Sequence, residues 1–418
     1  MSRIAVLRVP PRAPAPGRED GHGRSWWLRL RSFAAGVAVV AGLTAPLALA
    51  APAAAQSGTY AFVANQGSDT VSVIDTSSNT LVDTINVGDF PTGVALSPDR
   101  TRAYVSNLLG GTVSVIDTFT HDVVATVLGV GGGPGGLAVT PDGTLVYVAN
   151  ETSGDVAVID TTTNTVTATI AVGGNLVDVA ITPDGDTAYV SNVGSGSVAV
   201  IDIATNTVTT TIPVGTTPIG LAVSPDGSEV WVAVQDSDQV TVISTTTNTV
   251  TNNIPIPTTD PRDVAFTPDG ATAYVPDLGN PGNVSVIDTA TETVTTTVSV
   301  NNNPVQVAVT PDGGFVYVTN YQSSNVSVIN TTTNTVTDTV GVGGNPFGVA
   351  IGDIPASSLA ECPVDSVITG GGHEISGPPP SDFTSKPVGD AWQVSLTNEG
   401  DEPITFTPYA VCAPETTP

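Results

Sequence analysis

Carboxylates and one arginine are the side chains of this sequence best suited to form a binding site. Arg262 stands between Asp260 and Asp263 in the stretch TTDPRD, where a guanidinium could bind an anion through two parallel hydrogen bonds. The acids could instead attract a cation, because calcium prefers oxygen ligands. The candidate ligand-binding residues are Arg262, Asp263, Asp178, Gln306, Asp236, Asp238, Asp260 and Asp277.

Other catalytic side chains are scarce. The three histidines, His22, His121 and His373, lie far apart in the sequence, and no two have the spacing of metal ligands. The two cysteines, Cys362 and Cys412, are expected to form a disulfide, which would leave neither as a nucleophile. The sequence therefore predicts no catalytic residues, no metal site and no cofactor. A divalent cation such as calcium, held by the acids, is the alternative.

The elements that position these residues repeat along the chain. The element YVxN, or a variant of it, occurs seven times and ends at Asn65, Asn107, Asn150, Asn192, Val234, Asp277 and Asn320. Each period holds four short runs rich in Val, Ile and Thr, such as GLAVT, LVYVAN, VAVID and VTATIAV, and no helical periodicity. Four strands in about 40–45 residues are typical of a β-propeller blade.

The two ends of the repeat array are expected to share one blade. The array begins at Tyr60 with the second strand of a blade and ends near Asp353 with the first strand. Pairing of these ends would close the ring and leave no unmatched edge. The sequence thus predicts an all-β fold: a seven-bladed β-propeller of four-stranded blades over residues 57–354, with a shared closing blade.

The repeat also resembles a known family. The run from Pro304 to Gly343, with VAVTPDG, VYVTN, VSVIN and TTTNTV in order, resembles the YVTN-family β-propeller repeats of bacterial secreted and surface-layer-like proteins. The resemblance covers roughly Tyr60 to Asp353 and recurs in every blade. It implies the propeller fold and little about activity, because one fold hosts many functions.

Departures from the repeat single out the candidate residues. One position of the first strand is Gly in four copies and Asp178, Asp263 or Gln306 in the others, and we expect these side chains near the channel mouth. Arg262 is expected to pair with Asp263 or Asp260, or to orient an anionic group of a ligand, while Asp178 and Asp263 attract a cation. The repeated Asp of PDG and Asn of YVxN are interpreted as turn residues. Neutral drift is the first explanation of these departures, and a ligand or cation site is the alternative.

The first 55 residues have the composition of a secretory signal peptide, with Arg24, Arg29 and Arg31 before an apolar run and an Ala-rich end. Without residues 1–55, four basic residues face 37 acidic ones, a net charge of −33. Such a charge repels nucleic acid. We therefore expect a secreted or cell-surface protein that is a monomer and has no membrane span after signal removal.

The tail, residues 355–418, is expected to form a small β module closed by the Cys362–Cys412 disulfide. Two functions fit these observations. The first is a secreted scaffold that binds a protein or cell-envelope ligand on the face with the channel-mouth loops. The alternative is a metal-assisted lactonase- or lyase-like enzyme with its site at the channel mouth.

Overall fold

The computed structural model describes residues 2–6, 58–355, 366–376, 382–388, 391–397 and 405–414. The chain divides into two compact units. One is Ser57–Pro355, and the other combines Met1–Gln56 with Ala356–Pro418. Within the described ranges, no helix has the length and hydropathy that a membrane crossing requires.

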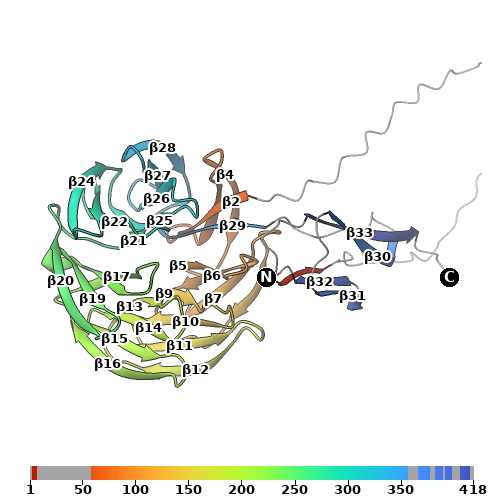
Figure 1. The fold of residues 1–418 in the computed structure, drawn as a ribbon, viewed down its shortest axis with the longest axis horizontal. Helices are drawn as coiled ribbons and strands as arrows, with labels where there is room; N and C mark the ends of the chain where they lie inside the picture. Colours follow the sequence, from red (N-terminus) through yellow and green to blue (C-terminus); the bar gives the residue numbers. More distant parts are fainter. Residues whose placement is uncertain are drawn as a thin grey trace, which may run out of the picture. The chain divides into compact units, whose positions relative to one another are not determined.

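The first unit is a seven-bladed β-propeller of four-stranded antiparallel sheets, as the repeat predicts (Figure 1). We number the blades along the chain and give their strands from the innermost outward. Blade 1 contains β29 (Pro346–Ile354), β2 (Gly58–Asn65), β3 (Thr70–Asp75) and β4 (Thr80–Asn86). Blade 2 contains β5 (Pro91–Leu96), β6 (Arg102–Asn107), β7 (Thr112–Asp117) and β8 (Val123–Val127). Blade 3 contains β9 (Pro134–Val139), β10 (Leu145–Asn150), β11 (Asp155–Asp160) and β12 (Thr165–Ala171).

The remaining blades have the same order of strands. Blade 4 contains β13 (Leu176–Ile181), β14 (Thr187–Asn192), β15 (Ser197–Asp202) and β16 (Thr207–Pro213). Blade 5 contains β17 (Pro218–Val223), β18 (Glu229–Val234), β19 (Gln239–Ser244) and β20 (Thr249–Pro255), with the 3-10 helix η1 (Gln235–Ser237) after β18. Blade 6 contains β21 (Ala265–Phe266), β22 (Thr272–Asp277), β23 (Asn283–Asp288) and β24 (Thr293–Ser299). Blade 7 contains β25 (Pro304–Val309), β26 (Phe315–Asn320), β27 (Asn325–Asn330) and β28 (Thr335–Gly341).

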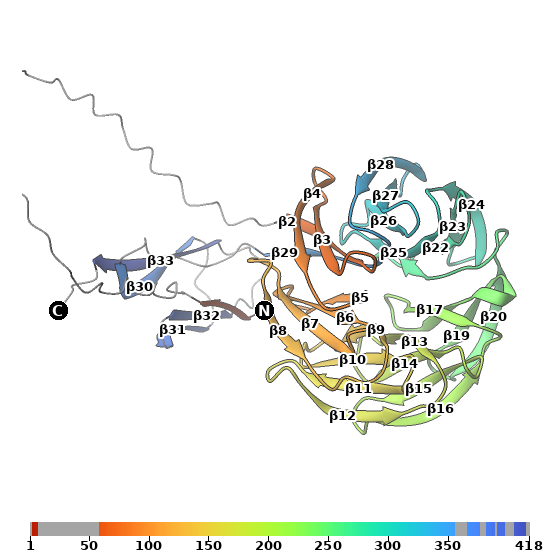
Figure 2. The ribbon, with the colours of Figure 1, turned by 180° about the vertical axis from the view of Figure 1, so that it is seen from behind.

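The shared closing blade is confirmed. β29, from the end of the array, pairs antiparallel with β2 from its start, with Phe62 opposite Ala350. Figure 2 shows β29 beside β2 and β3 although they lie far apart in the sequence. This pairing joins the two ends of the unit, so closure of the ring depends on the contacts with the longest sequence separation within the propeller.

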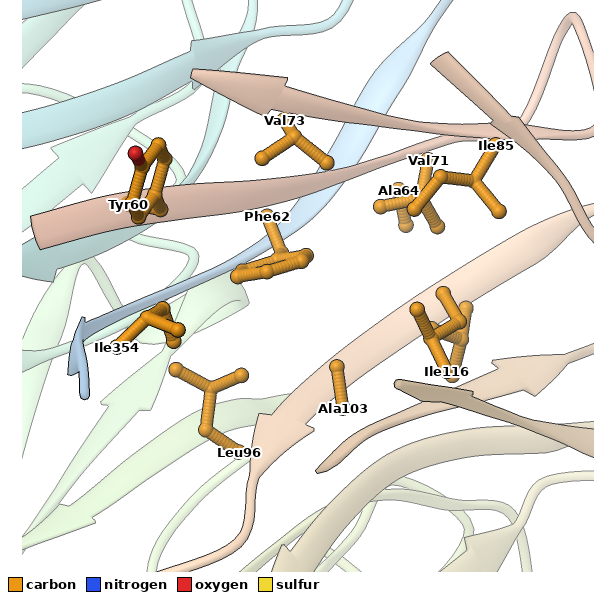
Figure 3. Close-up of a cluster of buried hydrophobic side chains, with 11 residues drawn as sticks. Tyr60, Phe62, Ala64, Val71, Val73, Ile85, Leu96, Ala103, Ile116 and Ile354 are labelled. Atoms are coloured by element: carbon orange, nitrogen blue, oxygen red, sulfur yellow. The ribbon is translucent and has the colours of Figure 1, made fainter. Parts of the chain in front are cut away.

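Apolar side chains between the blades hold the ring together. Figure 3 shows Phe62 of β2 and Ile354 of β29 facing Leu96 and Ile116 of blade 2. A similar cluster fills each junction between blades. The second and third strands of each blade are apolar on both faces because both faces are covered.

Blade 6 departs from the others at its innermost strand. β21 has only two residues, and Pro261 forms an isolated bridge with Asp277 instead of starting a continuous strand. The partner strand β22 reads YVPD, and Pro276 has no N–H to donate to the ladder. Its carbonyl instead accepts the backbone N–H of Arg262 at 2.9 Å. Arg262 therefore lies on an irregular stretch of an otherwise regular ring.

The second unit contains two small sheets. One joins β1 (Ser2–Val6), β32 (Ala391–Thr397) and β31 (Asp382–Val388), and the other joins β30 (Ser366–Ser376) and β33 (Thr405–Pro414). β1 falls inside the segment that we expect to be a cleaved signal. The predicted disulfide involves Cys362, which lies outside the described residues, as do residues 7–55 of the predicted signal.

Candidate functional site

A cavity of about 370 Å³ lies at the centre of the ring. Every blade contributes one residue at an equivalent position to the wall of this cavity. The innermost segment of each blade begins with Pro, or with Leu176 in blade 4, and the residue in question is the one that follows. From blade 1 to blade 7 these residues are Phe347, Thr92, Gly135, Val177, Ile219, Arg262 and Val305. Arg262 is the single charged member of this set, which we call the wall ring.

A second set of residues completes the cavity. The residue that follows each YVxN element lies at the start of the loop to the third strand, and those of blades 1 to 4 line the cavity: Gln66, Leu108, Glu151 and Val193. Glu151 comes from blade 3, three blades away from Arg262 around the ring. Its carboxylate accepts no hydrogen bond from the described residues. The cavity is thus lined by the acidic residues Glu151 and Asp178 as well as by Arg262.

The guanidinium of Arg262 has few partners. Its Nη1 donates to Oε1 of Gln235 at 3.1 Å, and its Nε is buried without a hydrogen-bond partner in the described part of the chain. Gln235 in turn donates a long bond from Nε2 to Oδ1 of Asp260 at 3.4 Å. Burial lowers the pKa of Arg262, while the charges of Asp263 and Asp260 oppose this change. An arginine remains protonated at neutral pH in such surroundings.

The expected pairing of Arg262 with Asp263 or Asp260 is wrong. Among the described residues only Arg102–Asp117 and His121–Asp83 form salt bridges, at 2.7 and 2.8 Å. Arg262 bonds the neutral amide of Gln235 instead, which follows β18 in the neighbouring blade. The guanidinium therefore faces the cavity without a carboxylate at salt-bridge distance.

Asp178, Asp263 and Gln306 have a shared role that the sequence did not reveal. Each side chain accepts the backbone N–H of the innermost strand in the next blade. Asp178 Oδ2 accepts from Leu221 at 3.2 Å, Asp263 Oδ2 from Val307 at 3.1 Å, and Gln306 Oε1 from Val349 at 3.0 Å. Asp178 and Gln306 also line the cavity, whereas Asp263 is buried behind it.

The two aspartates account for two of the glycines at the same position of other blades. A Cβ on Gly220 would lie 2.5 Å from Oδ1 of Asp263 and 2.7 Å from the carbonyl oxygen of Arg262. A Cβ on Gly136 would collide with Asp178 in the same way. Gly136 and Gly220 are therefore required where the next blade carries Asp, whereas Gly93 and Gly348 are required by backbone carbonyl oxygens of the next blade.

Enclosure of the two aspartates changes their protonation. Burial raises the pKa of Asp178 to about 6 and that of Asp263 to about 8. The charge of Asp178 contributes to the increase at Asp263, and the backbone N–H of Val307 opposes it. At neutral pH, Asp263 is therefore mostly protonated and does not neutralise Arg262.

The other candidate acids are engaged in loop structure beside blades 5 and 6. Asp236 Oδ2 accepts the hydroxyl of Thr217 at 2.5 Å, and Asp238 Oδ1 accepts the backbone N–H of Asp260 at 3.0 Å. Asp277 is 1% exposed, and burial raises its pKa to about 7. No group of three His, Cys, Asp or Glu side chains in the described ranges is arranged to hold a metal ion.

The repeated polar residues act as turn residues, as interpreted from the sequence. In the PDG turn, Asp142 Oδ1 accepts the Thr140 hydroxyl at 2.6 Å and the Thr144 backbone N–H at 3.0 Å. Asn107 of YVxN is buried, donates to two hydroxyls of its own blade and accepts the Gly88 N–H at 3.1 Å. These residues stabilise loops and are not free to bind a ligand.

The predicted position lines the cavity in five blades, through Gly93, Gly136, Asp178, Gly220 and Gln306, whereas the adjacent wall ring was missed except for Arg262. Phe347, Glu151 and Gln235 were not among the candidates. Alternate residues of a strand face opposite sides of the sheet, so the residues next to the predicted position could also have been considered. Arg262 could be selected from the sequence because it is the single arginine or lysine between Tyr104 and Ile354.

Comparison with known proteins agrees with the fold. A family model described as a seven-bladed β-propeller lactonase matches residues 117–253, and a model described as a YNCE-like β-propeller matches residues 27–142. No curated protein matches the chain significantly in sequence. The chain is thus a seven-bladed β-propeller. The YVTN assignment stays a prediction from the repeat.

Solved structures from several bacteria share the architecture. A functionally unknown protein from Desulfotomaculum acetoxidans has a TM-score of 0.63 at 18% identity, covering 71% of this chain and 99% of its own. A protein from Bacteroides uniformis assigned as a 6-phosphogluconolactonase has a TM-score of 0.62 at 15% identity, covering 70% and 99%. Hydrazine synthase from Kuenenia stuttgartiensis has a TM-score of 0.57 at 23% identity, covering 64% and 96%. At these identities the likeness concerns the fold alone.

Proposed function

We propose that the central cavity binds a small organic anion through Arg262. The observation that carries this proposal is a guanidinium on the cavity wall with no carboxylate at salt-bridge distance among the described residues. A buried, unpaired charge is costly, and a carboxylate placed beside it would restore both charge balance and hydrogen bonds. The protonated Asp263 leaves this positive charge available at neutral pH.

Lactone hydrolysis is the reaction that we propose for this site. The lactonase family model covers residues 117–253, which include Glu151, Asp178 and Ile219 of the cavity. Glu151 would accept a proton from water as the water oxygen attacks the lactone carbonyl carbon. The ring C–O bond then breaks, the ring oxygen takes up a proton and a hydroxy acid forms. Arg262 would stabilise the negative charge that develops on the carbonyl oxygen.

The two roles of Arg262, anion binding and charge stabilisation, need no metal. Among the described residues, no group of three His, Cys, Asp or Glu side chains could hold a metal ion. We favour a small anion over a cell-envelope partner as the ligand because the repeated loop residues already form hydrogen bonds within turns. Asn107 illustrates this engagement.

The first test compares anion binding by matched arginine variants of the full chain. Calorimetry would measure binding of phenylacetate and gluconate to the native chain, Arg262→Ala and Arg102→Ala. We expect Arg262→Ala to lose at least about tenfold in affinity, equal to about 1.4 kcal/mol, without a lower melting temperature. Arg102→Ala, which loses a surface ion pair at the far end of β6, should bind as the native chain does.

A charge variant separates the role of Arg262 from its packing. Gln235→Glu would place a carboxylate beside the intact guanidinium, so anion affinity should fall as in Arg262→Ala. Equal anion affinities in all four proteins would overturn the proposed binding site. Loss of binding in Arg102→Ala alone would overturn it as well.

The reaction has its own test. A pH-stat assay of γ- and δ-lactones that carry a carboxylate should detect hydrolysis by the native chain. Glu151→Gln should reduce kcat by about 100-fold, the typical contribution of a general base, while carboxylate binding persists. If the native chain binds carboxylates but hydrolyses no lactone of the panel, the hydrolase assignment is wrong and the binding site stands.

We also propose that the protein is exported. Three features of the sequence support this proposal. Residues 1–55 combine arginines with an apolar run, the rest of the chain has a net charge of −33, and the number of cysteines is even, at two. Mass spectrometry of the protein from its native host would test signal removal and disulfide formation. Removal of about 55 residues and a mass lower by two hydrogens than the reduced chain are expected; an intact N-terminus with two free thiols would refute them.

A further inference from the structure

The wall ring is apolar apart from one threonine, one glycine and Arg262. Phe347, Val177, Ile219 and Val305 present hydrocarbon to the cavity. A phosphosugar would need several polar partners at these positions, because each buried hydroxyl without a hydrogen bond costs free energy. An apolar body would instead gain from leaving water. The wall therefore distinguishes between hydrophilic and hydrophobic anions.

A second apolar group lies across the cavity from Arg262. Phe90 and Leu108 belong to blade 2, which is three blades away from blade 6 around the ring, and both line the cavity. The cavity volume of about 370 Å³ falls within the range of ~300–1,000 Å³ of small-molecule sites. An anion held at Arg262 would thus extend its body toward Phe90 and Leu108.

Phe90 occupies a backbone position that disfavours an aromatic residue. Its φ is +58°, in the left-handed region, and its carbonyl accepts the Leu108 N–H at 3.0 Å. The same backbone bond recurs in the other six blades, where the residue is Gly133, Asn175, Thr217, Asp260, Asn303 or Asn345. Asn and Asp tolerate this conformation, whereas a bulky residue is strained in it. A phenyl ring is therefore kept at the cavity at the expense of stability.

We infer that the ligand of this cavity is an organic acid with an apolar, preferably aromatic body, or the lactone of such an acid, rather than a sugar phosphate. This inference rests on the proposed function and specifies its substrate class. Arg262 holds the acidic group, the wall ring and Leu108 enclose the hydrocarbon, and the ring of Phe90 packs against it.

The test uses Phe90→Asn, which removes the ring and relieves the backbone. Calorimetry on the full chain would compare phenylacetate, its neutral amide phenylacetamide and the hydrophilic acid gluconate. We expect the native chain to bind phenylacetate at least about tenfold more tightly than gluconate, since burial of a phenyl group contributes more than the ~1.4 kcal/mol that tenfold requires. Phenylacetamide should bind more weakly than phenylacetate.

The variant distinguishes a ligand contact from a structural role. Phe90→Asn should weaken phenylacetate binding about tenfold, leave gluconate binding unchanged and raise the melting temperature. Loss of both affinities together with a lower melting temperature would overturn the inference. So would a native chain that binds gluconate as tightly as phenylacetate.

Failure of the proposed function would give a different pattern. If no acid binds, or if binding does not depend on Arg262, both proposals are refuted. If both acids bind through Arg262 and Phe90→Asn changes neither affinity, only the apolar substrate class is refuted.

Discussion

Replacement of Asp263 by asparagine should change how the stability of the propeller depends on pH. The folded pKa of about 8 lies above the ordinary value of 3.8, so the folded chain holds a proton that the unfolded chain has released. The contribution of Asp263 to the free energy of unfolding is therefore fully present below about pH 4 and is lost as the pH rises through about 8. The amide of the Asp263→Asn variant would not titrate, and its oxygen could still accept the Val307 N–H.

The magnitude follows from the pH interval. Between pH 5 and pH 8 each pH unit costs about 1.4 kcal/mol, so ~4 kcal/mol is the upper bound for the loss in the native chain. Water and side chains relax around a buried charge, and we therefore expect about half, ~2 kcal/mol. Asp263→Asn should remove this part of the slope and be the more stable protein at pH 8.

Chemical denaturation at pH 5, 6, 7 and 8 measures the difference between the two proteins. Asp269→Asn is the matched control, because Asp269 is an exposed turn residue whose pKa is lowered by the Thr267 hydroxyl. Its stabilising effect is present above the ordinary pKa of 3.8 and is lost only as pH falls below it. Parallel stability curves for the native chain and Asp263→Asn would refute the reasoning, because Asp263 would then titrate as in the unfolded chain.

Two further predictions concern the packing of neighbouring blades. Gly220→Ala should destabilise the propeller by about 1–3 kcal/mol in thermal or chemical unfolding, because the new Cβ would meet the backbone of blade 6. Gly341 has open space around it, so Gly341→Ala should change the stability very little. Equal effects of the two variants would contradict this explanation. Tyr147→Phe should cost about 1–2 kcal/mol by removing the 2.6 Å hydrogen bond to Asn206 Oδ1 in the next blade. Tyr104→Phe is the control, since this hydroxyl has no partner among the described residues; a loss as large as that of Tyr147→Phe would refute the assignment.

The fold could be read from the sequence because a propeller repeats local information. Each copy contains its own four strands and turns, and the split of the array between Tyr60 and Asp353 was sufficient to predict the shared blade. The pattern of YVxN and PDG also indicated which polar residues stabilise turns, because these bonds join residues close in sequence. Local hydrogen bonds in turns and the alternation of side chains along strands can be recognised directly in the sequence.

The site could not be read in the same way, because its contacts join different blades. Arg262 meets Gln235 rather than an adjacent acid, and Asp178 reaches a backbone N–H 43 positions away. The predicted position lines the cavity in five of the seven blades, but the sequence did not show that Asp178, Asp263 and Gln306 accept backbone N–H groups of the neighbouring blade. Repetition along the chain determined the ring of blades; only closure of that ring decided which side chains meet at its centre.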